Sequence, residues 1–229
     1  MMQLPLGIAL REAATFENYF TTDNDQALNA IRTALSVGES AVIYLWGGGE
    51  VGKSHLLQAA CHLAAESGMS STYLPLGEAE SWPPEMIEGF ESLELVCLDD
   101  VGQVAGRADW EEALFHLFNR LQEAGGILLV SADVAPASLS VKLNDLKSRL
   151  AWGLTFQLQP LDDEQKQQAL KTLAQRRGLE LPDESATYLL RHAPRGQGLL
   201  FSLLDRLDEA SMIEQRRLTI PFIKSVLNP

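Results

Sequence analysis

A strand-like run that ends in a glycine-rich turn constrains this chain more than any other stretch. Residues 41–54 read AVIYLWGGGEVGKS, and residues 55–66 carry apolar side chains at helical spacing. A strand, the pattern G-x-x-x-x-G-K-S and a helix in this order form a phosphate-binding loop, or P-loop. The residues predicted to bind a nucleotide here are Gly47, Gly48, Gly49, Glu50, Val51, Gly52, Lys53, Ser54 and His55. We therefore expect a nucleotide-binding α/β protein.

The end of this loop supplies the chemistry of a nucleotide site. Its glycines let the backbone aim successive N–H groups at phosphate oxygens, and the helix that begins near Gly52 adds its positive N-terminal end. Lys53 is expected to reach the β-phosphate, and the γ-phosphate where there is one. The Ser54 hydroxyl is expected to bind Mg²⁺.

Other apolar runs predict a five-stranded parallel sheet. Beside the strand before the P-loop, strands are expected within 70–76, 93–100, 127–133 and 143–158. Ligands of such sheets bind outside the carboxyl ends of the strands, so Asp99 and Asp100 should face the P-loop. Asp99 would hold Mg²⁺, usually through water, and Asp100 stands where many hydrolases carry a glutamate that orients the attacking water. Ser131 and Asp133, after the next strand, are candidate sensors of the γ-phosphate.

The chain divides by pattern into three parts. Residues 1–14 are expected to form an extended tail, residues 15–160 the α/β nucleotide-binding core, and residues 161–229 a small helical lid domain without strands. Within the core, the helix over 109–124 is expected to be capped by Asp109. The tail contains Gln3, Leu4, Pro5 and Leu6, which either dock on the chain's own core or enter a partner's pocket.

Composition excludes several classes of protein. Of the 229 residues, 31 are acidic and 18 are Lys or Arg, which gives a net charge of −13 and disfavours direct binding to DNA. No apolar run approaches the roughly 18 residues that would span a membrane. Two cysteines, Cys61 and Cys97, suit a reducing compartment, and the N-terminus lacks the basic start of a signal peptide. A cytoplasmic protein is expected.

Six phrases together resemble the DnaA branch of the AAA+ ATPases, and within it the Hda family of DnaA-related regulators of replication initiation. They are TFENYF at 15–20, YLWGGGEVGKSHLLQA at 44–59, LVCLDDV at 95–101, SAD at 131–133, LKSRLAWGL at 146–154 and LTIPFIK at 218–224. The resemblance covers nearly the whole chain. It implies an AAA+ core with a helical lid, and the chain ends where DnaA continues into a helix-turn-helix domain that reads DNA.

The resemblance also implies roles that the residues alone do not specify. Taken alone, Arg149 would be interpreted as a solvated member of an ion pair. In the family pattern it stands at the arginine-finger position, from which it would enter a neighbouring subunit's nucleotide site. Tyr19 and Phe20 lie near the family's base pocket, although core packing explains them equally well. Gly198 takes the sensor II position, with Arg195 three residues earlier. Weak discrimination for a triphosphate is expected from Gly198, so ADP or another diphosphate is the expected ligand, with ATP as the alternative.

The implied partners are DnaA and the DNA polymerase III sliding clamp. Residues 3–6 are similar to the clamp-binding motif of the family, in a shorter form. The leading hypothesis is a regulator that, with nucleotide bound, promotes hydrolysis of DnaA-bound ATP through Arg149 while showing little ATPase activity of its own. Two alternatives stay open: a self-sufficient ATPase resembling a helicase loader, and a tether in which the nucleotide is a structural plug. Head-to-tail homodimers or larger homo-oligomers also stay open.

Overall fold

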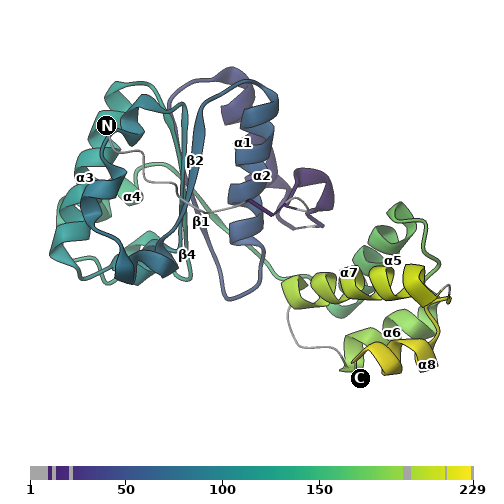
Figure 1. The fold of residues 1–229 in the computed structure, drawn as a ribbon. Helices are drawn as coiled ribbons and strands as arrows, with labels where there is room; N and C mark the ends of the chain where they lie inside the picture. Colours follow the sequence, from purple (N-terminus) through teal and green to yellow (C-terminus); the bar gives the residue numbers. More distant parts are fainter. Residues whose placement is uncertain (1–9, 12–13, 21–22, 193–196, 215, 228–229) are drawn as a thin grey trace. The chain divides into compact units, whose positions relative to one another are not determined.

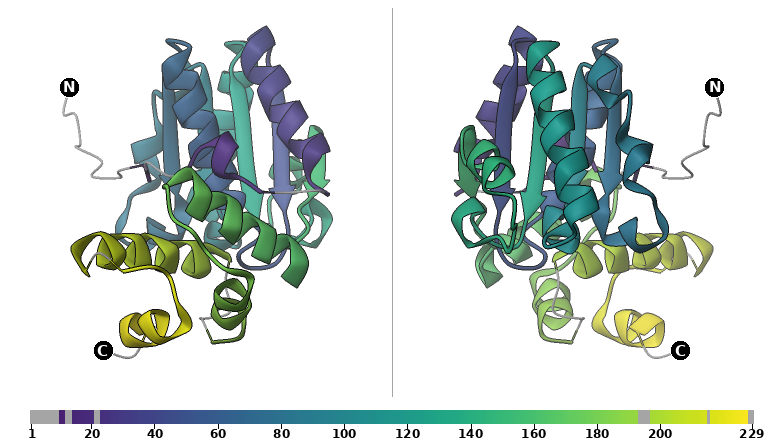
Figure 2. Two further views of the ribbon diagram at one scale, coloured as in Figure 1. Left: turned by 90° about the vertical axis from the view of Figure 1, so that its right-hand side faces the viewer. Right: turned by 90° about the vertical axis from the view of Figure 1, so that its left-hand side faces the viewer.

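The computed structural model describes residues 10–11, 14–20, 23–192, 197–214 and 216–227. The chain divides into two compact units: residues 1–49 and 53–159 form the α/β unit, and residues 50–52 and 160–229 form the helical unit. Figures 1 and 2 show the helices and strands of both units. None of the helices described here is long and apolar enough to cross a membrane.

A five-stranded parallel sheet forms the centre of the α/β unit, as the sequence predicted. Its strand order is β2-β3-β4-β1-β5. The strands are β1 (Ala41–Trp46), β2 (Ser71–Pro75), β3 (Leu95–Asp99), β4 (Ile127–Ala132) and β5 (Leu154–Gln157). Every residue of β3 and β4 is buried, which agrees with their continuous apolar runs and with a sheet covered on both faces.

Helices cover both faces of this sheet. Helices α1 (Asp25–Val37) and α2 (Lys53–Glu66) lie on one face, and α3 (Ala108–Glu123) and α4 (Asn144–Leu150) lie on the other (Figure 1). The predicted cap of α3 is wrong. The N-cap residue is Arg107, and Asp109 lies inside the first turn, where its charge still favours the helix N-terminus.

The helical unit contains four helices among its described residues. They are α5 (Asp163–Arg176), α6 (Asp183–His192), α7 (Gln197–Glu214) and α8 (Ile220–Leu227). Helix α5 begins with a capping box, because the Asp162 carboxylate accepts from the Gln165 N–H at 2.7 Å and the Gln165 side chain accepts from the Asp162 N–H at 2.9 Å. Buried apolar side chains hold the unit together, among them Leu170, Leu204, Leu207, Phe222 and Ile223.

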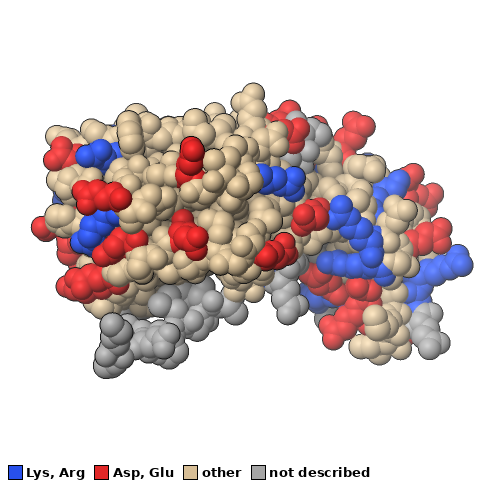
Figure 3. Space-filling view, turned by 90° about the horizontal axis from the view of Figure 1, so that it is seen from above, with Lys and Arg blue, Asp and Glu red and all other residues tan. Residues whose placement is uncertain are grey.

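Charge is distributed unevenly between the two parts of the chain. Residues 161–229 carry ten acidic and ten basic side chains, so the excess negative charge of the protein belongs to residues 1–160. In the face drawn in Figure 3, basic side chains of the helical unit lie close to acidic ones. Acidic and basic side chains are thus interspersed on this face of the helical unit.

Gly153, in the turn between α4 and β5, is expected to tolerate no side chain. A Cβ built on Gly153 would lie 2.1 Å from the carbonyl oxygen of Val42, a backbone atom of the neighbouring strand. We predict that Gly153→Ala lowers the free energy of unfolding by about 1–3 kcal/mol, because the strand must shift to relieve the overlap. Urea denaturation measures the change. Gly77→Ala is the matched control, since a Cβ there meets no atom within 4 Å, and an equal loss in both variants would contradict the argument.

Candidate functional site

Lys53 is the first residue of α2 and is only 9% exposed. Its Nζ donates to the carbonyl oxygens of Gly47 at 2.7 Å and Gly48 at 3.0 Å, and it forms an ion pair of 2.9 Å with the Asp133 carboxylate. The loop itself is fixed to the sheet, because the Gly47 N–H donates to the carbonyl oxygen of Ala132 at 3.3 Å. The structure thus brings together Lys53 and Asp133, the latter from the end of β4, at one edge of the sheet.

The loop between β1 and α2 has an unusual backbone. Glu50 has a φ of 67° and Gly52 a φ of 91°, and a positive φ is uncommon for a residue that carries a side chain. Gly48 and Gly49 are exposed, and a Cβ built on either would meet no atom within 4 Å. Val51 is buried and anchors the middle of the loop. Such backbone conformations recur where a loop binds a ligand, and open space beside the glycines is what phosphate oxygens require.

Asp99, the last residue of β3, is held from two sides. The Tyr73 hydroxyl donates to its Oδ2 at 2.6 Å, and the Ser131 hydroxyl donates to its Oδ1. The hydroxyl of Ser131 also accepts from the Asp100 N–H at 2.8 Å. Ser131 is fully buried, and this candidate sensor holds the carboxylate of Asp99 and the backbone of Asp100.

Asp100 has a φ of 59°, the second positive value at a non-glycine residue among those described. Its carboxylate accepts from the Gln103 side chain at 2.9 Å. Asp100 directly follows Asp99, the last residue of β3, and so lies at the carboxyl edge of the sheet, where its N–H contacts Ser131 of β4.

The oxygen donors near the P-loop fit a magnesium ion. Ser54 is exposed in the first turn of α2, and its side chain lies beside the Tyr73 hydroxyl, which donates to Asp99. A hydroxyl and a carboxylate are the protein ligands that Mg²⁺ uses together with nucleotide oxygens. The described residues contain no group of three or more His, Cys, Asp and Glu side chains that would hold a metal unaided. The donor set thus suits a cation that arrives with a nucleotide.

His55, Tyr19 and Phe20 join the N-terminal segment to the core. The His55 ring donates from Nε2 to the carbonyl oxygen of Thr15 at 2.7 Å, and burial lowers its pKa. Tyr19 is buried and its ring centroid lies 5.6 Å from that of His55, whereas Phe20 is half-buried. Burial raises the pKa of Tyr19 to about 12, although a hydrogen bond from Asn24 opposes this shift. These contacts give Tyr19 and His55 a packing role in the α/β unit.

Arg149 lies in the last turn of the short helix α4, on its exposed side. Its Cζ is 5.7 Å from the ring centroid of Phe118 in α3, and no carboxylate among the described residues forms an ion pair with it. The neighbouring Lys147 behaves differently, because its Nζ donates to the carbonyl oxygen of Leu139 at 3.2 Å. Trp152, which is 66% exposed, contacts the same Phe118 ring from the other side of the turn, with ring centroids 6.4 Å apart.

Several predicted residues lie outside the described part of the chain. They are Gln3, Leu4, Pro5 and Leu6 of the tail, and Arg195 of the helical unit. Gly198 falls in the first turn of α7. Tyr73 and Gln58 were missed by the sequence interpretation, because Tyr73 stands in the middle of a predicted strand and Gln58 within a predicted helix, away from the strand ends where site residues gather.

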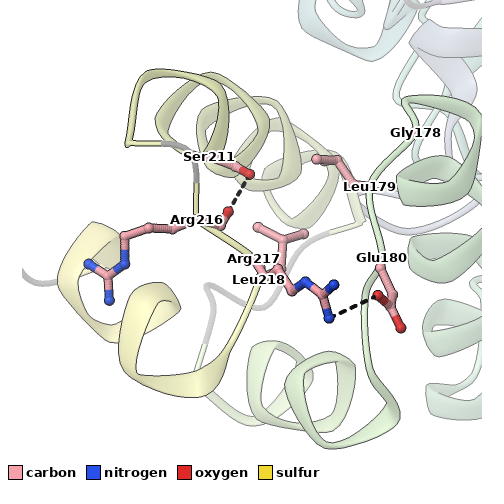
Figure 4. Close-up of a pocket in the computed structure, with 7 residues that line it drawn as sticks. All are labelled: Gly178, Leu179, Glu180, Ser211, Arg216, Arg217 and Leu218. Carbon is pink, nitrogen blue, oxygen red and sulfur yellow. Dashed lines mark hydrogen bonds and ion pairs between the residues drawn. The ribbon is translucent and has the colours of Figure 1, made fainter.

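A pocket of about 370 Å³ lies within the helical unit (Figure 4). Its lining is Gly178, Leu179, Glu180, Ser211, Arg216, Arg217 and Leu218. The Ser211 hydroxyl donates to the carbonyl oxygen of Arg216 at 2.6 Å, and Arg217 forms a long ion pair of 3.8 Å with Glu180. Both members of that pair are more than three-quarters exposed, so the pocket is a shallow, solvated feature without the P-loop chemistry.

Comparisons with known proteins match both units. The family model of the bacterial DnaA ATPase domain matches residues 10–157, and that of the Hda lid domain matches residues 163–227. Domain III of the replication initiation protein DnaA from Thermotoga maritima is 23% identical, with a TM-score of 0.79 over 97% of this chain and 100% of that one. AMPPCP-bound DnaA from Aquifex aeolicus is 25% identical, with a TM-score of 0.74 over 90% of this chain and 68% of that one.

A third similar structure carries a ligand and a nucleic acid. The replication initiator DnaA bound to AMPPCP and single-stranded DNA is 25% identical to this chain, with a TM-score of 0.74. The match covers 91% of this chain and 70% of that one. An AAA+ core followed by a helical lid thus extends along nearly the whole of the present chain.

Proposed function

Because the chain belongs to the bacterial DnaA ATPase domain family and continues into an Hda lid domain, we propose that it regulates DnaA. In this proposal the protein, with a nucleotide bound at its own P-loop, promotes hydrolysis of ATP bound to DnaA. ADP is the proposed ligand, with ATP as the alternative. The single observation that carries the proposal is the exposed Arg149, whose guanidinium has no ion-pair partner among the described residues.

The nucleotide site is supported by the P-loop and its neighbours. Lys53 and the N–H groups of the loop would bind phosphate oxygens, and Ser54 and Asp99 would hold Mg²⁺. Bound Mg²⁺ would neutralise phosphate charge. The presence of AMPPCP in two similar DnaA structures supports this assignment. In the present chain the site would serve mainly to hold the protein in its active conformation, because Asp100 takes the place of the glutamate found in many hydrolases.

The surface around Arg149 suits insertion into another subunit. Helix α4 is anchored by the buried Leu146 and Leu150, and the Phe118 ring lies under the guanidinium. The Phe118 ring therefore supports the guanidinium in its position. A carboxylate partner would instead compete with the phosphate oxygens that the guanidinium is proposed to bind. An arginine supplied in trans neutralises charge that develops on the transferred phosphoryl group.

The two partners, DnaA and the sliding clamp, are part of the same proposal. DnaA would supply the ATP that is hydrolysed, and the sliding clamp would bind the tail around residues 3–6. Recruitment by a clamp on DNA would place the protein near the replication machinery in the cytoplasm without direct DNA binding of its own. The uneven charge of the chain agrees with this, because residues 1–160 carry the whole excess of negative charge.

Trp152 provides a prediction about the same surface. Replacing this exposed indole by alanine is expected to reduce stimulation of DnaA about tenfold when DnaA is scarce, because a large aromatic side chain beside the finger is a typical anchor of an interface. Saturating DnaA should restore most of the rate. The measurement is the hydrolysis rate of DnaA-bound ATP against DnaA concentration. A Met212→Ala variant, which removes another exposed apolar side chain in the helical unit, serves as the control, and an equal loss there would contradict the assignment.

The alternatives can be separated from the proposal by one comparison. A self-sufficient ATPase would hydrolyse free ATP at about 1 s⁻¹ or faster without DnaA. A tether would bind the clamp and a second protein yet leave DnaA-bound ATP intact. The proposed regulator hydrolyses free ATP slowly and accelerates hydrolysis of DnaA-bound ATP. Radiolabelled ATP, supplied either free or bound to DnaA, distinguishes the three.

A further inference from the structure

A buried glutamine on α2 touches the N-terminal segment. Gln58 is 6% exposed, and its Oε1 accepts from the backbone N–H of Arg11 at 2.9 Å. Arg11 is fixed on the same helix a second time, because its carbonyl oxygen accepts from the His62 ring at 3.1 Å. The chain at Arg11 is therefore attached to the P-loop helix by backbone groups.

Tyr73 continues these contacts toward the carboxylate at the end of β3. The side chains of Gln58 and Ser54 lie beside the phenol oxygen and favour its charged form. Its own hydrogen is donated to Oδ2 of Asp99 at 2.6 Å. Burial and the neighbouring charge of Asp99 raise the pKa of Tyr73 far above its ordinary value, so the phenol stays a donor.

We infer that Tyr73 is a positioning residue for Asp99, and that Gln58 connects it to the N-terminal segment at Arg11. The Arg11 N–H donates to the Gln58 amide, the Gln58 side chain lies beside the Tyr73 hydroxyl, and that hydroxyl donates to Asp99. Because the Ser131 hydroxyl donates to the other carboxylate oxygen, the Asp99 side chain is held in one rotamer. The lone pairs of its oxygens that accept no hydrogen bond, and that would bind Mg²⁺, then point in a fixed direction. This inference rests on the proposed nucleotide site and adds that the N-terminal segment regulates that site.

Arg11 stands five residues after the candidate clamp motif at residues 3–6. A shift of Arg11 would release Gln58, loosen Tyr73 and lower the affinity for a nucleotide that carries Mg²⁺. By linkage, Mg²⁺ and nucleotide would in turn favour the attached position of the N-terminal segment.

The test measures ADP affinity of the full chain, with Mg²⁺ and with EDTA, by displacement of a fluorescent ADP analogue. Tyr73→Phe is expected to reduce the Mg²⁺-dependent gain in affinity about tenfold and to leave the affinity in EDTA unchanged, since a hydrogen bond to a charged group is lost. Tyr44→Phe is the matched control, because the Tyr44 hydroxyl donates to the carbonyl oxygen of Val134 at 3.0 Å. Equal losses in Mg²⁺ and in EDTA for Tyr73→Phe would overturn the positioning role.

The link to the N-terminal segment is tested by removing one backbone hydrogen. Arg11→Pro deletes the N–H that Gln58 accepts, whereas Arg11→Ala removes the same side chain and keeps the N–H. We expect Arg11→Pro and Gln58→Met each to lower the Mg²⁺-dependent gain about threefold, and the double variant to be no worse than either one. Arg11→Ala should match the parent.

Additive effects in the double variant, or an Arg11→Ala variant as weak as Arg11→Pro, would overturn the connection. Thermal melting of each variant without nucleotide separates a loss of folding from a loss of coupling. DnaA takes no part in these titrations. The ADP titrations can therefore be interpreted even if the protein does not stimulate DnaA. Conversely, if Gln58 does not connect Tyr73 to Arg11, the proposed role of Arg149 is unaffected.

Discussion

Replacing Arg149 with alanine is expected to abolish the stimulation of hydrolysis of DnaA-bound ATP. An arginine supplied in trans contributes about 10³–10⁵ in rate to phosphoryl transfer, so the variant should fall to the rate of DnaA alone. The measurement uses DnaA loaded with radiolabelled ATP, clamp on DNA, and an excess of this protein. Binding of ADP to the variant itself should be unchanged, because the described contacts of Arg149 are with Phe118 and not with the P-loop.

Two further variants sharpen this prediction. Arg149→Lys keeps the charge but loses the planar guanidinium that binds two oxygens at once, so it should recover only a small part of the stimulation. Lys147→Ala removes the neighbouring cation of the same helix, whose Nζ is engaged by the carbonyl oxygen of Leu139, and should stay within about twofold of the parent. Stimulation by Arg149→Ala equal to that of the parent would exclude the trans-acting finger and favour a tether.

The fold could be predicted because its signals are local. Continuous apolar runs indicated β3 and β4. The P-loop pattern then fixed where β1 ends and α2 begins. Local signals were weaker at helix ends, and α3 begins one residue before Asp109, which had been expected to cap it.

The candidate site was predictable only in part, because its contacts depend on strand order. Asp99 was identified from the end of an apolar run, but its two hydrogen-bond donors come from the strands on either side of β3. The order β2-β3-β4 puts Tyr73 on one side and Ser131 on the other, and no pattern within a single strand specifies that order. The support of Arg149 by the Phe118 ring likewise depends on how α4 packs on α3.

Replacing Lys53 with alanine is expected to raise the dissociation constant for ADP roughly 100-fold, since charge-assisted hydrogen bonds to phosphate are lost. The variant should still fold, because Asp133, the ion-pair partner of Lys53, is 62% exposed and can be solvated. Fluorescent ADP displacement measures the affinity. Lys142→Ala, which removes an exposed lysine from the same unit, is the control.

Thermal melting of the Lys53→Ala variant with and without ADP distinguishes the proposed regulator from the alternative tether. At a concentration of 100 times the dissociation constant, bound ADP stabilises the folded parent by about 2.7 kcal/mol, and the variant should lose this gain while its melting without ADP changes little. If the nucleotide were only a structural plug, Lys53→Ala would unfold the protein or lower its stability, and Arg149→Ala would have no effect. A folded Lys53→Ala variant that has lost both ADP binding and stimulation of DnaA would instead show that the nucleotide controls how Arg149 is presented.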